Sequence, residues 1–273
     1  MPSTTTKEQG DSSKASGIGG VAFVAHGAPT LAIDEEKGRP FRAWGSSIER
    51  PRAILMVSAH YERAPAALSS SRALPLVYDF SGFPRALSEV KYAAPGAPFV
   101  VDLVKGALGA DTRVDEQRGL DHGAWTPLVH MFPAADVPTI QLSLPTITDD
   151  QALFRLGERL APLVDEGVLV MGSGNLTHNL RRVIFDENAP VIDWAKEFDD
   201  WAQGALTRFD VDALVSWRDR APAARLAHPR EEHWAPLLVV AGTAHASGRT
   251  RVRFPVDGFE YGTLTRRSVS FDA

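Results

Sequence analysis

A chain of 273 residues with 44% hydrophobic and 23% charged residues has the composition of an ordinary globular protein that can bury a sizeable core. Its formal net charge of -5 at pH 7 argues against a nucleic-acid partner, and no apolar stretch approaches the roughly 20 residues needed to span a membrane. The absence of cysteine excludes disulfides and iron–sulfur clusters and is consistent with a cytoplasmic protein.

The first 19 residues differ in composition from the rest of the chain. They are polar, rich in glycine and serine, and without the apolar core of a signal peptide. We therefore expect a disordered tail over residues 1–19 and one folded domain over residues 20–273.

Beyond the tail, short apolar runs alternate with segments of helical spacing. In chain order, the expected elements are the strand Val21–Ala25, the helix Phe41–Glu49, the strand Ala53–Ser58, the helix Gly96–Leu108, the strand Thr139–Leu144, the helix Asp149–Asp165, the strand Val168–Met171, a helix-rich stretch over Ile192–Trp217, the helix Glu231–Ala244, and the late strands Arg251–Pro255 and Ser268–Phe271. This alternation predicts a three-layer α/β/α domain around a mostly parallel or mixed sheet.

Four histidines stand beside a glycine or a turn in segments that are far apart in the chain. They are His26 in VAFVAHGAP, His60 in AILMVSAHYE, His178 in VLVMGSGNLTHNL and His233 in AHPREEHWAPLL. The first three follow expected strands, and the loops beyond the carboxyl ends of parallel strands converge on one crevice. In a chain without cysteine, such a cluster indicates a metal site built from nitrogen and oxygen ligands.

Each of these histidines also has a structural explanation. His26 or His60 alone could cap its turn through the ring nitrogens. Two of them at the ends of neighbouring strands favour a site for Fe, Zn, Cu or Ni. Either His233 or the adjacent Glu232, at the start of an expected helix, could complete that site. No His-x-x-x-His pair is present, so the ligands would come from distant segments.

The turn before His178 contains Gly172 and Gly174, which permit close approach of the backbone to a ligand. Asn175 or Thr177 could cap a short helix that follows. Alternatively, the glycines form only a tight turn, and His178 and Asn179 serve only as caps.

His122 lies in GLDHGAW, on an expected loop before a helical segment over Trp125–Phe132, with Asp121 as a possible partner. It is either a catalytic residue or a surface histidine. The remaining histidines have no comparable setting and are expected to be structural or exposed: His130, His228 and His245.

Taken together, HGAP, SAHY, YDFSGFP, KYAAPG, LDHGAW, GSGNLTHNL and EEHWAPL resemble the DOPA 4,5-dioxygenase-like branch of the class III extradiol ring-cleaving dioxygenases. The resemblance extends from Val21 to Phe271, so it implies that residues 20–273 form a catalytic domain. It implies metal ligation by His26, His60 and His233, and acid–base roles for His178 and His122.

The resemblance also implies an activity. A non-haem Fe(II) enzyme of this kind would open the ring of a substituted, DOPA-like catechol with O2 to give a semialdehyde. Zn(II) could replace iron in purified protein, since zinc generally binds one site more tightly than Fe(II). Aromatic residues expected to contact the catechol are Tyr78, Phe80 and Trp125.

Some positions depart from the usual pattern of the resembled branch. Ala28, Tyr61 and the pair Arg230-Glu231 stand where HGSP, SAHW and TPEH are more common, which leaves the substrate open rather than the metal. Glu232 remains a substitute for His233 as third ligand, and His178 a possible fourth ligand. Two other functions stay open: a zinc-dependent hydrolase with Glu232 as general base, and a non-catalytic binding protein of the same superfamily.

Overall fold

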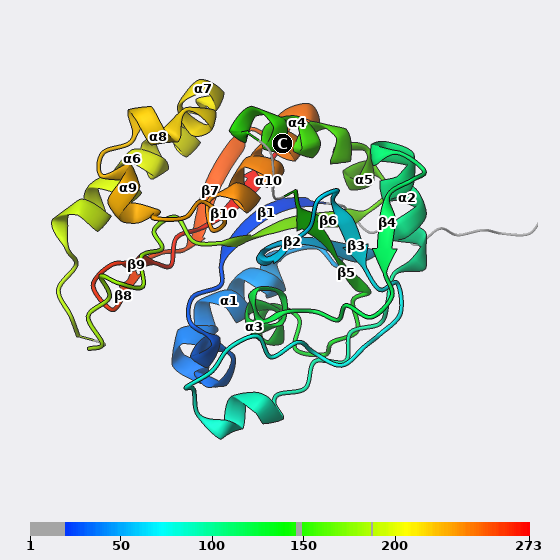
Figure 1. Ribbon diagram of the computed structural model, residues 1–273, viewed down its shortest axis with the longest axis horizontal. Helices are drawn as coiled ribbons and strands as arrows, with labels where there is room; N and C mark the ends of the chain where they lie inside the picture. The colour runs from blue at the N-terminus through cyan, green and yellow to red at the C-terminus, as the bar shows by residue number, and fades with distance from the viewer. Residues whose placement is uncertain (1–19, 146–148, 187) are drawn as a thin grey trace, which may run out of the picture.

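The computed structural model describes residues 20–145, 149–186 and 188–273, so the tail expected at 1–19 lies outside the described residues. Its centre is an eight-stranded sheet with the strand order β4-β3-β5-β2-β6-β1-β10-β7 and helices on both faces (Figure 1). The predicted three-layer α/β/α architecture with a mixed sheet is confirmed.

Four neighbouring strands at the middle of the sheet are parallel. In spatial order, the strands are β4 (Arg113–Asp115), β3 (Ala67–Ser69), β5 (Thr139–Leu144), β2 (Ala53–Glu62), β6 (Val168–Gly174), β1 (Gly20–Ala25), β10 (Ser268–Asp272) and β7 (Arg251–Val256). Strands β5, β2, β6 and β1 run in the same direction, whereas β3 is antiparallel to β5, and β10 is antiparallel to β1 and β7. The carboxyl ends of β1, β2 and β6 therefore lie together at one edge.

Helices cover the two faces of the sheet separately. On one face lie α2 (Pro98–Leu108), α4 (Asp150–Leu160), α5 (Pro162–Asp165) and α10 (Ala235–Ala246), and on the other lie α1 (Glu35–Ser47) and α3 (His122–Met131) (Figure 1). Beyond the β1 side of the sheet, at the left of Figure 1, are α6 (Asp193–Thr207), α7 (Val211–Val215), α8 (Trp217–Arg220), α9 (Ala224–Ala227) and the ribbon of β8 (Phe259–Glu260) and β9 (Leu264–Thr265). Two short 3-10 helices are η1 (Pro29–Ile33) and η2 (Arg85–Glu89).

Successive side chains of β1 point alternately to the two faces of the sheet, and each face has its own hydrophobic core. Val21 and Phe23 pack into the core beneath α10, whereas Ala22 and Val24 pack into the core beneath α1 and α3. Because both faces of the strand are buried, it appears in the sequence as a continuous apolar run.

Several boundaries differ from those predicted. Helix α1 begins at Glu35 rather than Phe41, because the Asp34 carboxylate caps it by accepting a hydrogen bond from the Lys37 backbone N–H at 2.9 Å. The single helix expected over Asp149–Asp165 is divided, since Pro162 starts the separate helix α5.

The helix expected over Glu231–Ala244 begins only at Ala235, with a proline in its first turn. His233 therefore lies in the turn before α10 and not on the helix. Because His233 is outside the helix, its side chain is not confined to one helical face and can lie near the ends of the strands.

A long connection, residues 70–97, joins β3 to α2 and contains only η2 as regular structure. We call it the strap. Backbone atoms of Val77 anchor it: the Val77 N–H donates to the Leu120 carbonyl at 2.8 Å, and Trp125 Nε1 donates to the Val77 carbonyl at 3.2 Å. The strap is thereby fixed across the amino-terminal end of α3.

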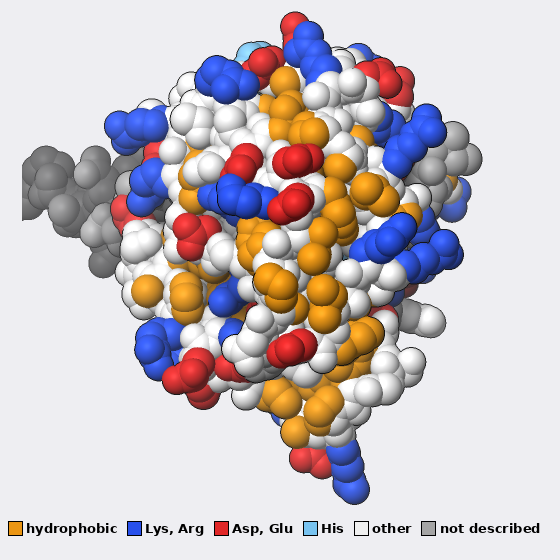
Figure 2. All heavy atoms as spheres, turned by 90° about the vertical axis from the view of Figure 1, so that its left-hand side faces the viewer, with side chains coloured by type: hydrophobic (Ala, Val, Ile, Leu, Met, Phe, Trp, Pro, Cys, Tyr) orange, Lys and Arg blue, Asp and Glu red, His pale blue; other side chains and the backbone are white. Residues whose placement is uncertain are grey.

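Exposed apolar side chains gather on the face at the left of Figure 1. Figure 2 shows them as a broken band interrupted by charged groups. Large apolar residues exposed in the segments after β6 and in α9 are Leu180, Ile184, Phe185, Val191 and Leu226. Among the described residues, none of the helices has the length and apolar character required to cross a membrane.

Candidate metal centre

Three imidazoles meet at the edge where the parallel strands end. His26 directly follows β1, His60 lies near the end of β2, and His233 precedes α10. The Nε2 atoms of His26 and His60 are 3.1 Å apart. The His233 ring centroid is 5.3 Å from that of His26 and 5.0 Å from that of His60. Each of the three offers a ring nitrogen within 4.8 Å of the others, a spacing that one metal ion could bridge.

Hydrogen bonds on the far side of two rings determine which nitrogen faces the centre. Ser173 Oγ donates to the Gly123 carbonyl at 2.5 Å, so it accepts from His26 Nδ1 at 2.9 Å. His233 Nδ1 donates to Glu232 Oε1 at 3.2 Å. Both rings therefore keep Nε2 unprotonated and directed away from these partners, as metal ligands with a hydrogen-bonded second nitrogen do.

The His233 Nε2 atom provides the test of whether these residues suit a metal. It is buried and has no hydrogen-bond partner among the described residues. A buried polar atom without a partner is costly, and the close contact between the Nε2 atoms of His26 and His60 brings three imidazole nitrogens around one point. This donor set fits Fe(II) or Zn(II).

The electrostatics of the cluster keep the rings neutral. Burial, followed by the neighbouring histidines, lowers the pKa of His26 and His233 well below the usual value. Burial, followed by His122, lowers the pKa of His60 to about 4. Neutral imidazole is the form that binds metal, so these rings do not require deprotonation before they bind one at neutral pH.

Two glycines allow the segments to approach each other. A Cβ on Gly174 would lie 2.1 Å from the His233 carbonyl oxygen, and one on Gly123 would lie 2.5 Å from Ser58 Oγ and 3.0 Å from His60 Cδ2. Any larger residue at either position would displace His60, His233 or the backbone next to them.

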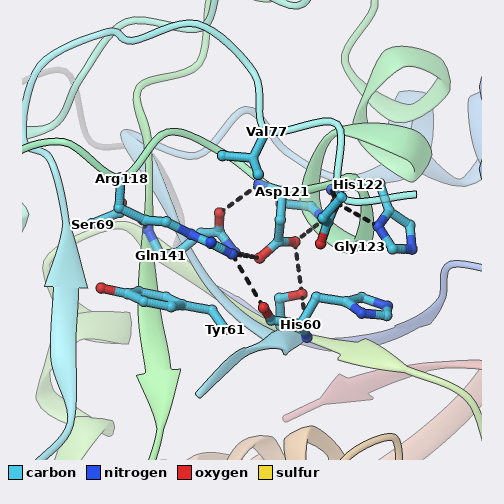
Figure 3. A network of polar contacts seen from close by, with 12 residues as sticks. His60, Tyr61, Ser69, Val77, Arg118, Asp121, His122, Gly123 and Gln141 are labelled. Carbon is cyan, nitrogen blue, oxygen red and sulfur yellow. Dashed lines mark hydrogen bonds and ion pairs between the residues drawn. The ribbon is translucent and has the colours of Figure 1, made fainter. Parts of the chain in front are cut away.

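A buried carboxylate fixes the backbone around His60 (Figure 3). Asp121 Oδ1 accepts from Ser58 Oγ at 2.8 Å, and Oδ2 accepts from Arg118 Nη2 at 2.9 Å and Gln141 Nε2 at 2.8 Å. Arg118 also donates to the His60 carbonyl at 3.1 Å, and Ser58 Oγ accepts from the His60 N–H at 3.2 Å. Asp121 thus stabilises the end of β2 from both sides of His60.

The partner predicted for His122 is wrong. Asp121 caps α3 by accepting from the Ala124 N–H at 3.2 Å, whereas His122 Nδ1 is hydrogen-bonded to Asp79 Oδ1 at 2.7 Å. His122 is also the first residue of α3 rather than part of a loop. Its ring lies against His60, with centroids 4.0 Å apart.

His178 lies on the other side of the cluster. Its ring stacks on that of His233, with centroids 3.4 Å and planes 11° apart. Its backbone N–H donates to the Ala227 carbonyl at 2.9 Å. Burial, followed by the charges of His228 and the other histidines, lowers the pKa of His178 to about 3. The short helix expected after Gly174 is absent from the described part of residues 175–192.

Three aromatic residues were predicted as substrate contacts, and two of them are only partly buried. The Phe80 ring is one of these, and it meets His122 edge-on at 5.8 Å between centroids. Tyr78 is partly exposed and contacts Trp125, which is fully buried behind it. Phe80 is therefore the one of the three that borders the histidine cluster.

The other three histidines lie outside the cluster and have partners of their own. His130 Nε2 is bonded to the Leu31 carbonyl, His228 Nε2 to the Leu176 carbonyl, and His245 Nδ1 to Glu158.

Comparison with known proteins bears on this centre. The family described as the catalytic LigB subunit of aromatic ring-opening dioxygenase matches residues 20–271. The chain is 40% identical to the 4,5-DOPA dioxygenase extradiol of Beta vulgaris, over 84% of this chain and 88% of that one. It is 34% identical to the protein of the same name from Escherichia coli K12, over 90% and 92%. The crystal structure of the uncharacterized protein JW3007 from Escherichia coli K12 superposes with a TM-score of 0.77 at 31% identity, covering 92% of this chain and 98% of that one.

Proposed function

This chain belongs to the LigB family and is a ring-cleaving extradiol dioxygenase, and on that premise we propose that it uses non-haem Fe(II) to open the ring of a substituted, DOPA-like catechol with O2. Family membership implies a metal; iron and the DOPA-like substrate are our proposals. The observation that carries the iron site is the unpartnered Nε2 of His233, beside the paired Nε2 atoms of His26 and His60.

We assign His26, His60 and His233 as the metal ligands. An iron ion held by them would supply a Lewis acid with open positions for the two catechol oxygens and dioxygen. Glu232 serves as the hydrogen-bond partner of His233 instead of replacing it, since its Oε1 lies 3.2 Å from His233 Nδ1. Such partners orient a ligand ring and raise its basicity.

Proton transfer is assigned to the two histidines that border the ligands. His178, neutral and stacked on His233, accepts a proton from the catechol and returns it during ring opening. His122, in contact with His60, hydrogen-bonds the substrate at the opposite side. Phe80, partly buried beside His122, packs against the catechol ring or its substituent.

The substrate class is proposed from the relatives. Two of them carry the name 4,5-DOPA dioxygenase extradiol and are aligned over most of their length. Opening a catechol beside its two hydroxyls with both atoms of O2 gives a semialdehyde, which absorbs visible light and is readily followed. We propose that residues 20–273 carry out this reaction as one catalytic domain.

The test is an anaerobic titration followed by oxygen. Metal-free protein is loaded with Fe(II) or, in parallel, with Zn(II), and mixed with DOPA, catechol and protocatechuate under nitrogen before air is admitted. The proposal expects one O2 consumed per semialdehyde formed, with iron only, and the highest rate with DOPA.

Other results would identify the alternatives. Turnover of an ester or amide panel by the zinc form without oxygen would indicate a hydrolase. Tight catechol binding by the iron form without oxygen consumption would indicate a binding protein.

A further inference from the structure

Asp79 on the strap holds the ring and the backbone of His122 at the same time. One carboxylate oxygen, Oδ1, lies 2.7 Å from His122 Nδ1 and 3.2 Å from the His122 backbone N. The His122 side chain is only 8% exposed and that of Asp79 is 25% exposed, so water competes weakly for the ring nitrogen.

An ionised carboxylate accepts hydrogen bonds and cannot donate them. Burial acts to raise the pKa of Asp79, but the hydrogen bonds from His122 outweigh it and the pKa is lowered, so the group is ionised at neutral pH. His122 Nδ1 must therefore carry the proton. In the neutral ring, Nε2 is then an acceptor on the opposite edge, and the ring lies against His60.

Asp79 is itself held in place by its neighbours. The backbone of Val77 is bonded in both directions, and the Tyr78 hydroxyl donates to the Val90 carbonyl at 2.7 Å. On the other side of Asp79, Phe80 packs against Trp125, with centroids 6.0 Å apart. A carboxylate fixed in this way determines the orientation of the histidine it contacts.

We propose that Asp79 is the positioning residue that fixes His122 in the Nδ1–H tautomer, so that His122 meets the substrate through Nε2 as a hydrogen-bond acceptor. This inference rests on the proposed function, which gives His122 its contact with substrate. It extends that function in two ways. It names Asp79 as the residue that orients His122, and it specifies that His122 Nε2 accepts a hydrogen bond from a catechol hydroxyl.

Two simpler explanations for Asp79 lead to different results. Asp79 accepts the first N–H of α3, so it could serve only as a helix cap. His60, Asp79 and His122 also present ligand atoms within 4.8 Å of one another, so Asp79 could belong to a second metal site. A cap affects stability alone, and a ligand affects metal content.

The first measurement needs neither metal nor substrate. Long-range nitrogen-15 NMR of the metal-free protein at pH 8.5 distinguishes protonated from unprotonated ring nitrogens, and the His122→Gln spectrum identifies the His122 signals. We expect Nδ1–H in the wild-type protein. In Asp79→Asn, whose amide can donate to Nδ1, we expect the Nε2–H form to appear. An unchanged tautomer in Asp79→Asn would overturn the proposal.

The second measurement is a double-mutant cycle on the iron-loaded enzyme. Partners behind a functional histidine typically contribute about 10–100-fold, so Asp79→Asn should lower kcat by that factor with little change in KM or iron content. Asp79→Asn in the His122→Gln background should cost nothing more, because its effect passes through the missing ring. An additive loss, or loss of iron, would refute the assignment.

Asp210→Ala is the matched control, since the Asp210 carboxylate caps α7 by accepting from the Ala213 N–H at 3.0 Å. It should lower stability as the loss of a cap does while kcat stays at the wild-type value. If it lowers kcat as Asp79→Asn does, the effect is one of stability and the proposal fails. If the wild-type enzyme opens no catechol, the proposed function fails, and the NMR result alone decides the role of Asp79.

Discussion

Gly174→Ala should move His233, the proposed third metal ligand, away from His26 and His60. Gly174 is the last residue of β6, and its added Cβ would lie 2.1 Å from the His233 carbonyl oxygen and 3.1 Å from the carbonyl carbon. The carbonyl is bonded to the Asn175 N–H at 3.1 Å, so it cannot rotate away freely. Ordinary contact begins at 3.4 Å, and the turn carrying His233 must therefore move by about 1 Å.

The expected cost has two parts. Forcing one extra carbon into a closely packed region typically lowers the free energy of unfolding by about 1–3 kcal/mol, which corresponds to roughly 2–4 °C in Tm for each kcal/mol in a protein of about this size. Displacing His233 relative to His26 and His60 should weaken metal binding by about 10–100-fold, the usual effect of disturbing the support of a ligand.

Calorimetric titration of the metal-free protein with zinc measures the second part, and thermal unfolding measures the first. Gly106→Ala is the control, because Gly106 lies in α2 with no atom within 4 Å of the added Cβ. Alanine there should stabilise the helix by about 0.5–1 kcal/mol without changing zinc affinity. Wild-type zinc affinity in Gly174→Ala would refute the placement of His233.

Three further predictions concern the site and its surroundings. His178→Ala should keep its iron but lose about 100- to 10,000-fold in turnover, whereas His26→Ala should lose the iron; equal metal loss in an iron assay would make His178 a fourth ligand. Asp121→Ala should lower the free energy of urea unfolding by about 3–5 kcal/mol, because it leaves the largely buried Arg118 unpaired; a loss below about 1 kcal/mol would contradict this. Burial lowers the pKa of His228 to about 4, although the hydrogen bond with the Leu176 carbonyl favours the charged ring. Below pH 6.5, the unfolded chain therefore binds a proton at His228 that the folded chain does not. Its contribution to stability is present above pH 6.5 and falls by about 2 kcal/mol by pH 5. Denaturation of His228→Gln should show a weaker dependence on pH.

The sequence predicted the histidines that follow a recognisable strand, but it did not predict the residues that form hydrogen bonds with them. His26 and His60 follow apolar runs, so their meeting at one edge follows from parallel strands. Ser173 and Asp79 act on histidines 147 and 43 residues away, respectively, and no local pattern pairs them.

Helix boundaries were missed where capping outweighs helical propensity. Asp121 precedes a helix in the manner of an N-cap, and that signal could have placed His122 on α3. Likewise, Pro236 marks the true start of α10, although the preceding glutamates favour a helix.

The way the strap is attached has a consequence for how this enzyme can diversify. The hydrogen bonds at Val77 use only its backbone N–H and carbonyl, so they do not depend on its side chain. The three proposed ligands, His26, His60 and His233, come from the strand ends and from the turn before α10, outside residues 70–97. The anchor at Val77 can therefore keep its path when that side chain changes, whereas Tyr78 and Phe80 support the neighbouring Asp79 through their side chains. Substitutions in the strap therefore change residues near His122 without altering the elements that carry His26, His60 and His233.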